Sequence, residues 1–274
     1  MRRLVKTQIA QRLKKLQAAL GEACKHTHAD AIHDLRVSIR RLSRALRVFR
    51  TRFDAGRVKR IRRRLRNLME RCAAVRNCDI ALEVLQAAGC GSPDLAAGLD
   101  LERRHMRQNL DRKLETWRRR DRVRRWRGQL RIGASAQERE SPDEYARRLL
   151  PALVEELFRA GREAARPESS HQRMHQFRLK TKRVRYTLEL FESVYGGTTT
   201  QIMESLKGLQ EKLGAINDCA TTIEMVRRDR DAAAAVRRLA DQREAEFRDY
   251  WKKHFRPREL SRWKAVLRAA DGKK

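Results

Sequence analysis

Apolar side chains recur every three or four residues along most of the chain, the spacing that places them on one face of an α-helix. Similar stripes cover residues 58–75 and 202–216. No segment alternates convincingly between apolar and polar residues, so the pattern predicts no β-strand. The sequence therefore predicts an all-α fold. The clearest stripe consists of Ile32, Leu35, Ile39, Leu42, Leu46 and Phe49.

Start and stop signals divide this pattern into eight predicted helices. Ser92 and Ser141 each precede a proline at a first helical position, and Glu144 completes a capping box with Ser141. Gly196-Gly197 predicts a helix end, and Pro151 should kink or restart the fifth helix. The predicted helices span residues 3–24, 29–52, 57–88, 93–130, 141–164, 168–195, 199–227 and 230–255, with a short helix after Pro257.

The second half of the chain repeats the first. At an offset of 142, His33–Arg41 matches His175–Arg183 in its His, an Arg, an aliphatic residue and two consecutive cations. At an offset of 141, Cys78 matches Cys219. Because order and spacing persist over most of each half, each half should be a four-helix bundle. We therefore expect a single domain, residues 1–274, of two bundles related by internal pseudo-two-fold symmetry, residues 1–136 and 137–274.

The repeated helix carries cations opposite its apolar stripe when residues are placed about 100° apart. Like charges one turn apart repel each other, which favours an anion bound along the row over a merely solvated face. Phosphate groups suit such a linear row better than an isolated carboxylate does. In the first copy the cationic face consists of His33, Arg36, Arg40, Arg44 and Arg47. In the second it consists of His175, Arg178 and Lys182, with Arg185 at its edge and Tyr186 and Glu189 replacing two arginines.

Composition extends this interpretation. The formal net charge is +31, and 51 of the 66 cationic residues are Arg, whose planar fork suits phosphate oxygens. A compact fold with this excess repels itself, so we expect a polyanionic partner: nucleic acid, an anionic membrane surface or free polyphosphate. No apolar stretch approaches 18 residues, so no membrane span is expected. The five cysteines include no C-x-x-C pair, which favours reduced thiols and a cytoplasmic location.

The repeated motif resembles the CHAD family, the conserved histidine α-helical domain. The resemblance lies in the pattern H-x-x-R-[VIL]-x-x-[RK]-R of both copies, and it covers roughly residues 1–255. Downstream, Cys72–Asp79 and Leu213–Asp218 are similar to the family element L-G-x-x-R-D-x-D. The sequence departs from the family at Ser43, where Arg is usual, and at Asn77, where Asp is usual.

The resemblance implies two four-helix bundles that face each other and bind inorganic polyphosphate in a basic groove or pore. Neither His33 nor His175 has a nearby sequence partner that suggests a nucleophile or a metal-held water, so we expect binding without catalysis. We also expect no cofactor, no metal and a monomer associated with polyphosphate granules. The binding residues that the resemblance implies are His33, Arg36, Arg40, Arg41, His175, Arg178, Lys182, Arg183 and Arg185. The helical wheel and the repeat add Arg44, Arg47, Arg66 and Lys207.

Two other functions compete with this interpretation. The charge also allows a basic helical protein that binds nucleic acid, at least nonspecifically, although no base-reading motif is visible. An enzyme acting on a phosphate chain would need metal-binding carboxylates near the cationic face, and the acidic residues look scattered. The ligand types of Cys24, His26, His28 and His33 suit zinc, but their spacing matches no familiar site and the second half lacks them.

Overall fold

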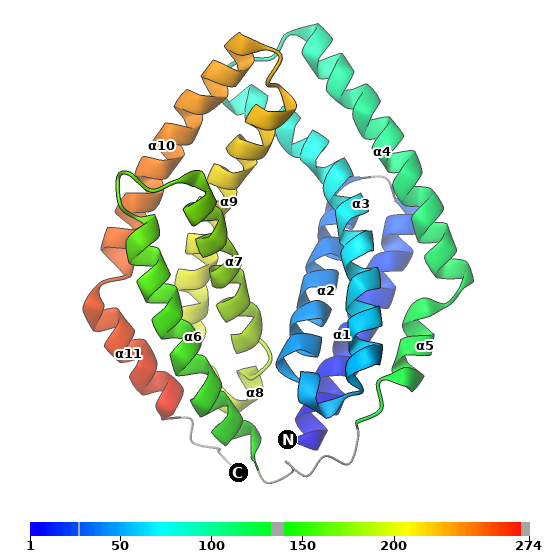
Figure 1. The fold of residues 1–274 in the computed structure, drawn as a ribbon, viewed down its shortest axis with the longest axis vertical. Helices are drawn as coiled ribbons and strands as arrows, with labels where there is room; N and C mark the ends of the chain where they lie inside the picture. Colours follow the sequence, from blue (N-terminus) through cyan, green and yellow to red (C-terminus); the bar gives the residue numbers. More distant parts are fainter. Residues whose placement is uncertain (27, 133–139, 270–274) are drawn as a thin grey trace. The chain divides into compact units, whose positions relative to one another are not determined.

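The computed structural model describes residues 1–26, 28–132 and 140–269, and these residues form helices and no strand (Figure 1). The all-α prediction is confirmed. The chain forms two compact units: unit 1 comprises Met1–Gln86 and Gly91–Arg139, and unit 2 comprises Ala87–Cys90 and Glu140–Lys274. The predicted boundary between residues 136 and 137 lies outside the described residues. The pseudo-two-fold relation of the halves stays a prediction.

Unit 1 is organised around α1, which packs along α2 and also contacts α4 and α5. The stripe predicted for residues 32–49 is the buried face of α2: Leu35, Leu42 and Leu46 are fully buried, and Ile39 is 2% exposed. The same helix can therefore present its opposite face to solvent. The elements of this unit are α1 (Arg2–Lys25), α2 (Ala29–Val48), the 3-10 helix η1 (Arg50–Arg52), α3 (Ala55–Ala87), α4 (Pro93–Arg119) and α5 (Arg122–Gln129).

Unit 2 has α7 in contact with both α6 and α9, while α10 packs on α9 and α11 on α6. An aromatic cluster joins several of these helices. The Trp251 and Phe255 rings stack 4.6 Å apart, and Phe158 meets Trp263 edge-on at 5.3 Å. The elements are α6 (Pro142–Ala164), α7 (His171–Leu188), α8 (Glu192–Tyr195), α9 (Thr200–Met225), α10 (Arg230–His254) and α11 (Pro257–Arg268). None of the described helices combines the length and apolarity that a membrane crossing requires.

Two helices predicted as continuous are each broken in the structure. The segment 93–130 divides at Asp121, whose backbone is left-handed with φ 39°. This break lets Trp126 of α5 meet Trp117 of α4 edge-on, with ring centroids 5.3 Å apart. The segment 168–195 divides after Leu188, where Phe191 is fully buried between α7 and α8. In both cases burial of a large apolar side chain overrides the local helical pattern.

The predicted helix punctuation is otherwise largely confirmed. Ser92 Oγ accepts a hydrogen bond from the Leu95 N–H, and Ser141 and Glu144 form the reciprocal capping box. A short helix follows Pro257 as predicted. Pro151 was expected to kink or restart the fifth helix, and the restart does not occur, because α6 continues through this buried residue to Ala164.

The packing of α6 against Trp251 gives a stability test. Gly161 lies so close to the Trp251 ring that an added Cβ would overlap it. Gly161→Ala should therefore lower the free energy of unfolding by about 1–3 kcal/mol through overpacking. Gly214→Ala is the matched control, because nothing lies within 4 Å of a Cβ there and a helix interior favours Ala over Gly. Equal stability of the two variants in urea denaturation would contradict this packing.

Candidate anion-binding site

His33 lies near the start of α2, and several cations of unit 1 act on its imidazole. Arg36 and Arg40 follow on the same helix, and Arg76 of α3 lies close enough for its charge to act on the imidazole. Partial burial, then the charge of Arg40, lowers the pKa of His33 below 6.5, and Arg36 and Arg76 lower it further while Asp34 raises it. The imidazole therefore sits in a positive local potential.

A second cationic cluster lies further along the same pair of helices. Arg47 of α2 and Arg66 of α3, both predicted site residues, flank Arg62 of α3. Burial and then the charges of Arg47 and Arg66 lower the pKa of the Arg62 guanidinium. Its buried Nε makes no hydrogen bond to the described residues. Sequence reasoning missed Arg62, although it lies one turn before Arg66 on α3 and the helical spacing could have found it.

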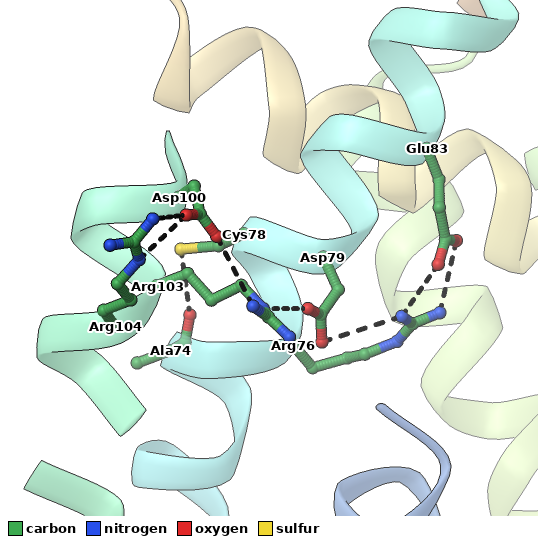
Figure 2. A network of polar contacts seen from close by, with 8 residues as sticks. All are labelled: Ala74, Arg76, Cys78, Asp79, Glu83, Asp100, Arg103 and Arg104. Carbon is green, nitrogen blue, oxygen red and sulfur yellow. Dashed lines mark hydrogen bonds and ion pairs between the residues drawn. The ribbon is translucent and has the colours of Figure 1, made fainter. Parts of the chain in front are cut away.

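Carboxylates hold the Arg76 guanidinium in place (Figure 2). Glu83 accepts two hydrogen bonds from the Arg76 guanidinium, at 2.9 and 3.3 Å. Asp79, which is only 9% exposed, lies 3.8 Å from the same guanidinium and accepts a 2.6 Å hydrogen bond from Arg103 of α4. Asp100 pairs with Arg103 at 3.4 Å and also with Arg104. The network ties α3 to α4 and fixes the position of the Arg76 guanidinium, whose charge acts on His33.

The face of unit 2 is organised around His175 of α7. Its Nδ1 lies 2.9 Å from Oδ1 of Asn217 on α9, an acceptor that favours the tautomer protonated on Nδ1. Arg185 donates a 2.8 Å hydrogen bond to Gln210 Oε1 and lies 3.6 Å from Glu189. Both α7 side chains are thus oriented by polar groups of α9.

The structure also separates residues that the sequence placed together. Arg183 lies 3.3 Å from Glu156 of α6, which also pairs with Lys180 at 3.1 Å, so Arg183 faces α6. Tyr186 was expected at the position of an arginine on the cationic face, but it is buried and only 7% exposed. An aromatic ring at this position contributes more by packing than by exposure. Of the other predicted residues, the half-buried ones are Arg41, Arg44, Arg178 and Lys182, and Lys207 is exposed.

Corresponding residues of the two halves occupy corresponding local positions. His33 lies near Arg76 of α3, and His175 lies against Asn217 of α9, at sequence offsets of 142 and 141. Likewise, Arg103 of α4 bonds Asp79 next to Cys78, whereas Arg243 of α10 lies 3.1 Å from the Cys219 sulfur. The two repeated histidines therefore have partners of different chemistry, a cation for His33 and a neutral amide for His175.

Two histidines of the proposed zinc-ligand group, His26 and His28, interact at helix ends instead. His28 is the N-cap of α2, and its Nδ1 accepts a hydrogen bond from the Ala31 N–H at 3.2 Å. His26 lies 3.4 Å from Glu22 at the end of α1. Within the described part of the chain, no group of three or more His, Cys, Asp or Glu side chains could hold a metal ion.

Comparisons with known proteins agree with this fold. A family model described as the CHAD domain matches residues 7–227. The crystal structure of the CHAD domain from the plant Ricinus communis is similar, with a TM-score of 0.59 and 20% identity over 99% of this chain and 92% of that chain. PptA from Streptomyces chartreusis has a TM-score of 0.63 and 16% identity over 96% and 98% of the two chains. No curated protein matches this sequence.

The potential around His33 predicts a pH dependence. The unfolded chain holds a histidine proton with a pKa near 6.5, and the folded protein holds it less tightly. Protonation of His33 therefore favours unfolding, and the stability it contributes above pH 6.5 is lost as pH falls through the lowered pKa. NMR titration without added anions should give a His33 pKa below 6.5.

His33→Gln should reduce the loss of stability between pH 7 and pH 5. The matched control is His105→Gln, a substitution at an exposed histidine on α4. A His33 pKa at or above 6.5 in the anion-free protein would contradict the cationic environment.

Proposed function

The chain belongs to the CHAD domain family, and from this premise we propose that it binds inorganic polyphosphate, without catalysis, through the cationic faces of α2 and α7. The observation that carries the proposal is the clustering of cations on the α2–α3 face of unit 1. Arg36, Arg40 and Arg76 act together on His33, and the Arg47–Arg62–Arg66 cluster follows along the same helices. Bound phosphates would relieve the repulsion within both clusters.

The length of this face suits a chain of phosphates better than a single ion. Arg36 and Arg47 are eleven residues apart on one helix, which corresponds to about 16 Å at 1.5 Å per residue. Consecutive phosphates of a linear polymer can contact successive cations along that distance. Each contact releases counterions, so the affinity should fall steeply with salt, by analogy with DNA.

The carboxylates near these faces support a binding role. Asp79 and Glu83 are engaged with Arg76, and Asp79 also with Arg103. On unit 2, Glu156 is engaged with Lys180 and Arg183. Carboxylates paired with guanidinium groups orient cations, whereas metal-assisted phosphoryl chemistry requires carboxylates that hold divalent ions. We propose that the carboxylates here position the cations.

The central test of the proposal removes one cation from each face. The double variant Arg36→Glu and Arg178→Glu should weaken binding of long-chain polyphosphate at least about a hundredfold, because each substitution removes a charge-assisted contact and adds repulsion. Binding is measured by isothermal titration calorimetry, and circular dichroism checks helicity. Arg36→Gln with Arg178→Gln keeps the side-chain size if the Glu variant fails to fold, and should give a smaller loss.

The matched control carries the same charge change away from both faces. Lys15 of α1 and Arg159 of α6 are exposed, one in each unit. Lys15→Glu with Arg159→Glu should change the affinity far less than the test variant does. If the folded test variant and this control bound polyphosphate equally, the faces of α2 and α7 would not be the binding site.

A competition experiment separates polyphosphate binding from nucleic-acid binding. Long-chain polyphosphate should displace labelled double-stranded DNA of equal total charge, and DNA should compete poorly for bound polyphosphate at each of several salt concentrations. Equal competition would instead indicate a nonspecific nucleic-acid-binding protein. The same samples with added Mg²⁺ should release no orthophosphate, and release by the pure protein would establish an enzyme.

A further inference from the structure

Unit 1 contains a cavity of about 450 Å³ between α1 and the end of α5, on surfaces that the proposed polyphosphate face does not use. Its volume falls within the range of small-molecule pockets. Its walls are mainly aliphatic: Val5, Ile9, Ala10, Leu13, Leu130 and Ile132. Phe53 is the one aromatic side chain among the described residues that line it.

Four cations complete the lining of this cavity. Two of them, Arg2 and Lys6, belong to α1. Arg127 belongs to α5, and Arg131 follows that helix. All four are exposed residues, whereas Val5 and Ile9 are buried. No carboxylate is found among the described residues of the lining. The cavity therefore combines an apolar interior with a positively charged surround.

The cationic surface continues beyond the cavity. A second hollow is lined by Lys14, Gln17, Ala18, Arg124 and Arg127, so Arg127 borders both spaces. Ala10, Lys14 and Ala18 recur every four residues, which places them on one side of α1. The two hollows thus follow the same junction of α1 and α5.

We propose that this cavity binds a single-chain amphipathic anion, with an aliphatic tail in the cavity and a carboxylate or phosphate headgroup on the surrounding cations. Entry of the ligand's tail between these aliphatic walls would remove the tail's own apolar surface from water. Guanidinium groups suit either headgroup through paired hydrogen bonds. The site is independent of the proposed polyphosphate function, because it involves none of the cations of the α2–α3 face.

Two other anions fit these walls less well. A polyphosphate chain is polar along its whole length and gains nothing from an aliphatic surface. A nucleic acid would present bases, which bind single-strand sites by stacking on aromatic rings. Phe53 is the single ring in the described lining, whereas binding of a strand by stacking uses successive aromatic side chains. The arrangement therefore favours a ligand that is apolar at one end and anionic at the other.

The experiment titrates the full-length protein with dodecanoate, below its critical micelle concentration, by isothermal titration calorimetry. Saturable binding of about one molecule per chain is expected. Lauroyl lysophosphatidic acid, with an equal tail and a phosphate headgroup, distinguishes the two headgroup sources by its relative affinity. Dodecyl maltoside supplies a comparable tail without charge, and inorganic phosphate a headgroup without a tail. Each should bind at least about tenfold more weakly than the better amphiphile.

Two variants locate the site, each with a matched control on α1. Ala10→Trp fills the cavity from an exposed position and should abolish binding, whereas Gln11→Trp, exposed but outside the lining, should not. Lys6→Glu with Arg127→Glu should weaken binding at least about tenfold, whereas Arg3→Glu with Lys15→Glu makes the same charge change outside the lining and should have little effect.

Several results would overturn the proposal. These are no saturable binding of either amphiphile, equal binding by dodecyl maltoside, or full binding by the folded Ala10→Trp variant. Polyphosphate binding by the Ala10→Trp variant should match that of the unmodified protein. This readout keeps failure of the cavity proposal distinct from failure of the polyphosphate proposal.

Discussion

The structure depends on the opposition of two faces of one helix. On α2, Leu35, Leu42 and Leu46 are fully buried, while Arg36 and Arg40 lie on the other side. Burial of each such leucine contributes about 1.5–3 kcal/mol, whereas repulsion between like charges one turn apart costs only about 0.2–0.5 kcal/mol. Burial of the apolar side therefore outweighs the repulsion within the row of cations, so the helix can keep these charges on one side.

The two halves apply this principle with different polar partners. In unit 1, Arg76 adds a charge beside His33 and is itself held by Glu83 and Asp79. In unit 2, the corresponding position is Asn217, which orients His175 without adding charge. The second face is consequently less basic, and its histidine is fixed by a neutral group. Repetition of the chain has preserved the framework while the electrostatics of the two faces have diverged.

Unit 1 carries two cationic surfaces of different chemistry. The α2–α3 face carries the half-buried Arg62, whose Nε is buried and makes no hydrogen bond to the described residues. The α1–α5 surface instead surrounds an aliphatic cavity. A net charge of +31 alone does not distinguish these surfaces. The two surfaces differ in the side chains that accompany the cations, which are mainly aliphatic only at the α1–α5 cavity. This difference determines which class of anion each surface favours.

The spacing of residues along the chain was enough to predict the all-α fold, most helix boundaries, the internal repeat and the cations that share one side of α2, because helical geometry fixes which residues lie on the same side of a helix. It could not determine the breaks at Asp121 and after Leu188, where burial of Trp126 and Phe191 overrides local preference. It also could not predict that the charge of Arg47 acts on Arg62, or that Arg183 forms an ion pair with Glu156. These interactions join residues on different helices, and they depend on how the helices pack, because the pattern along one helix carries no record of its neighbour's side chains.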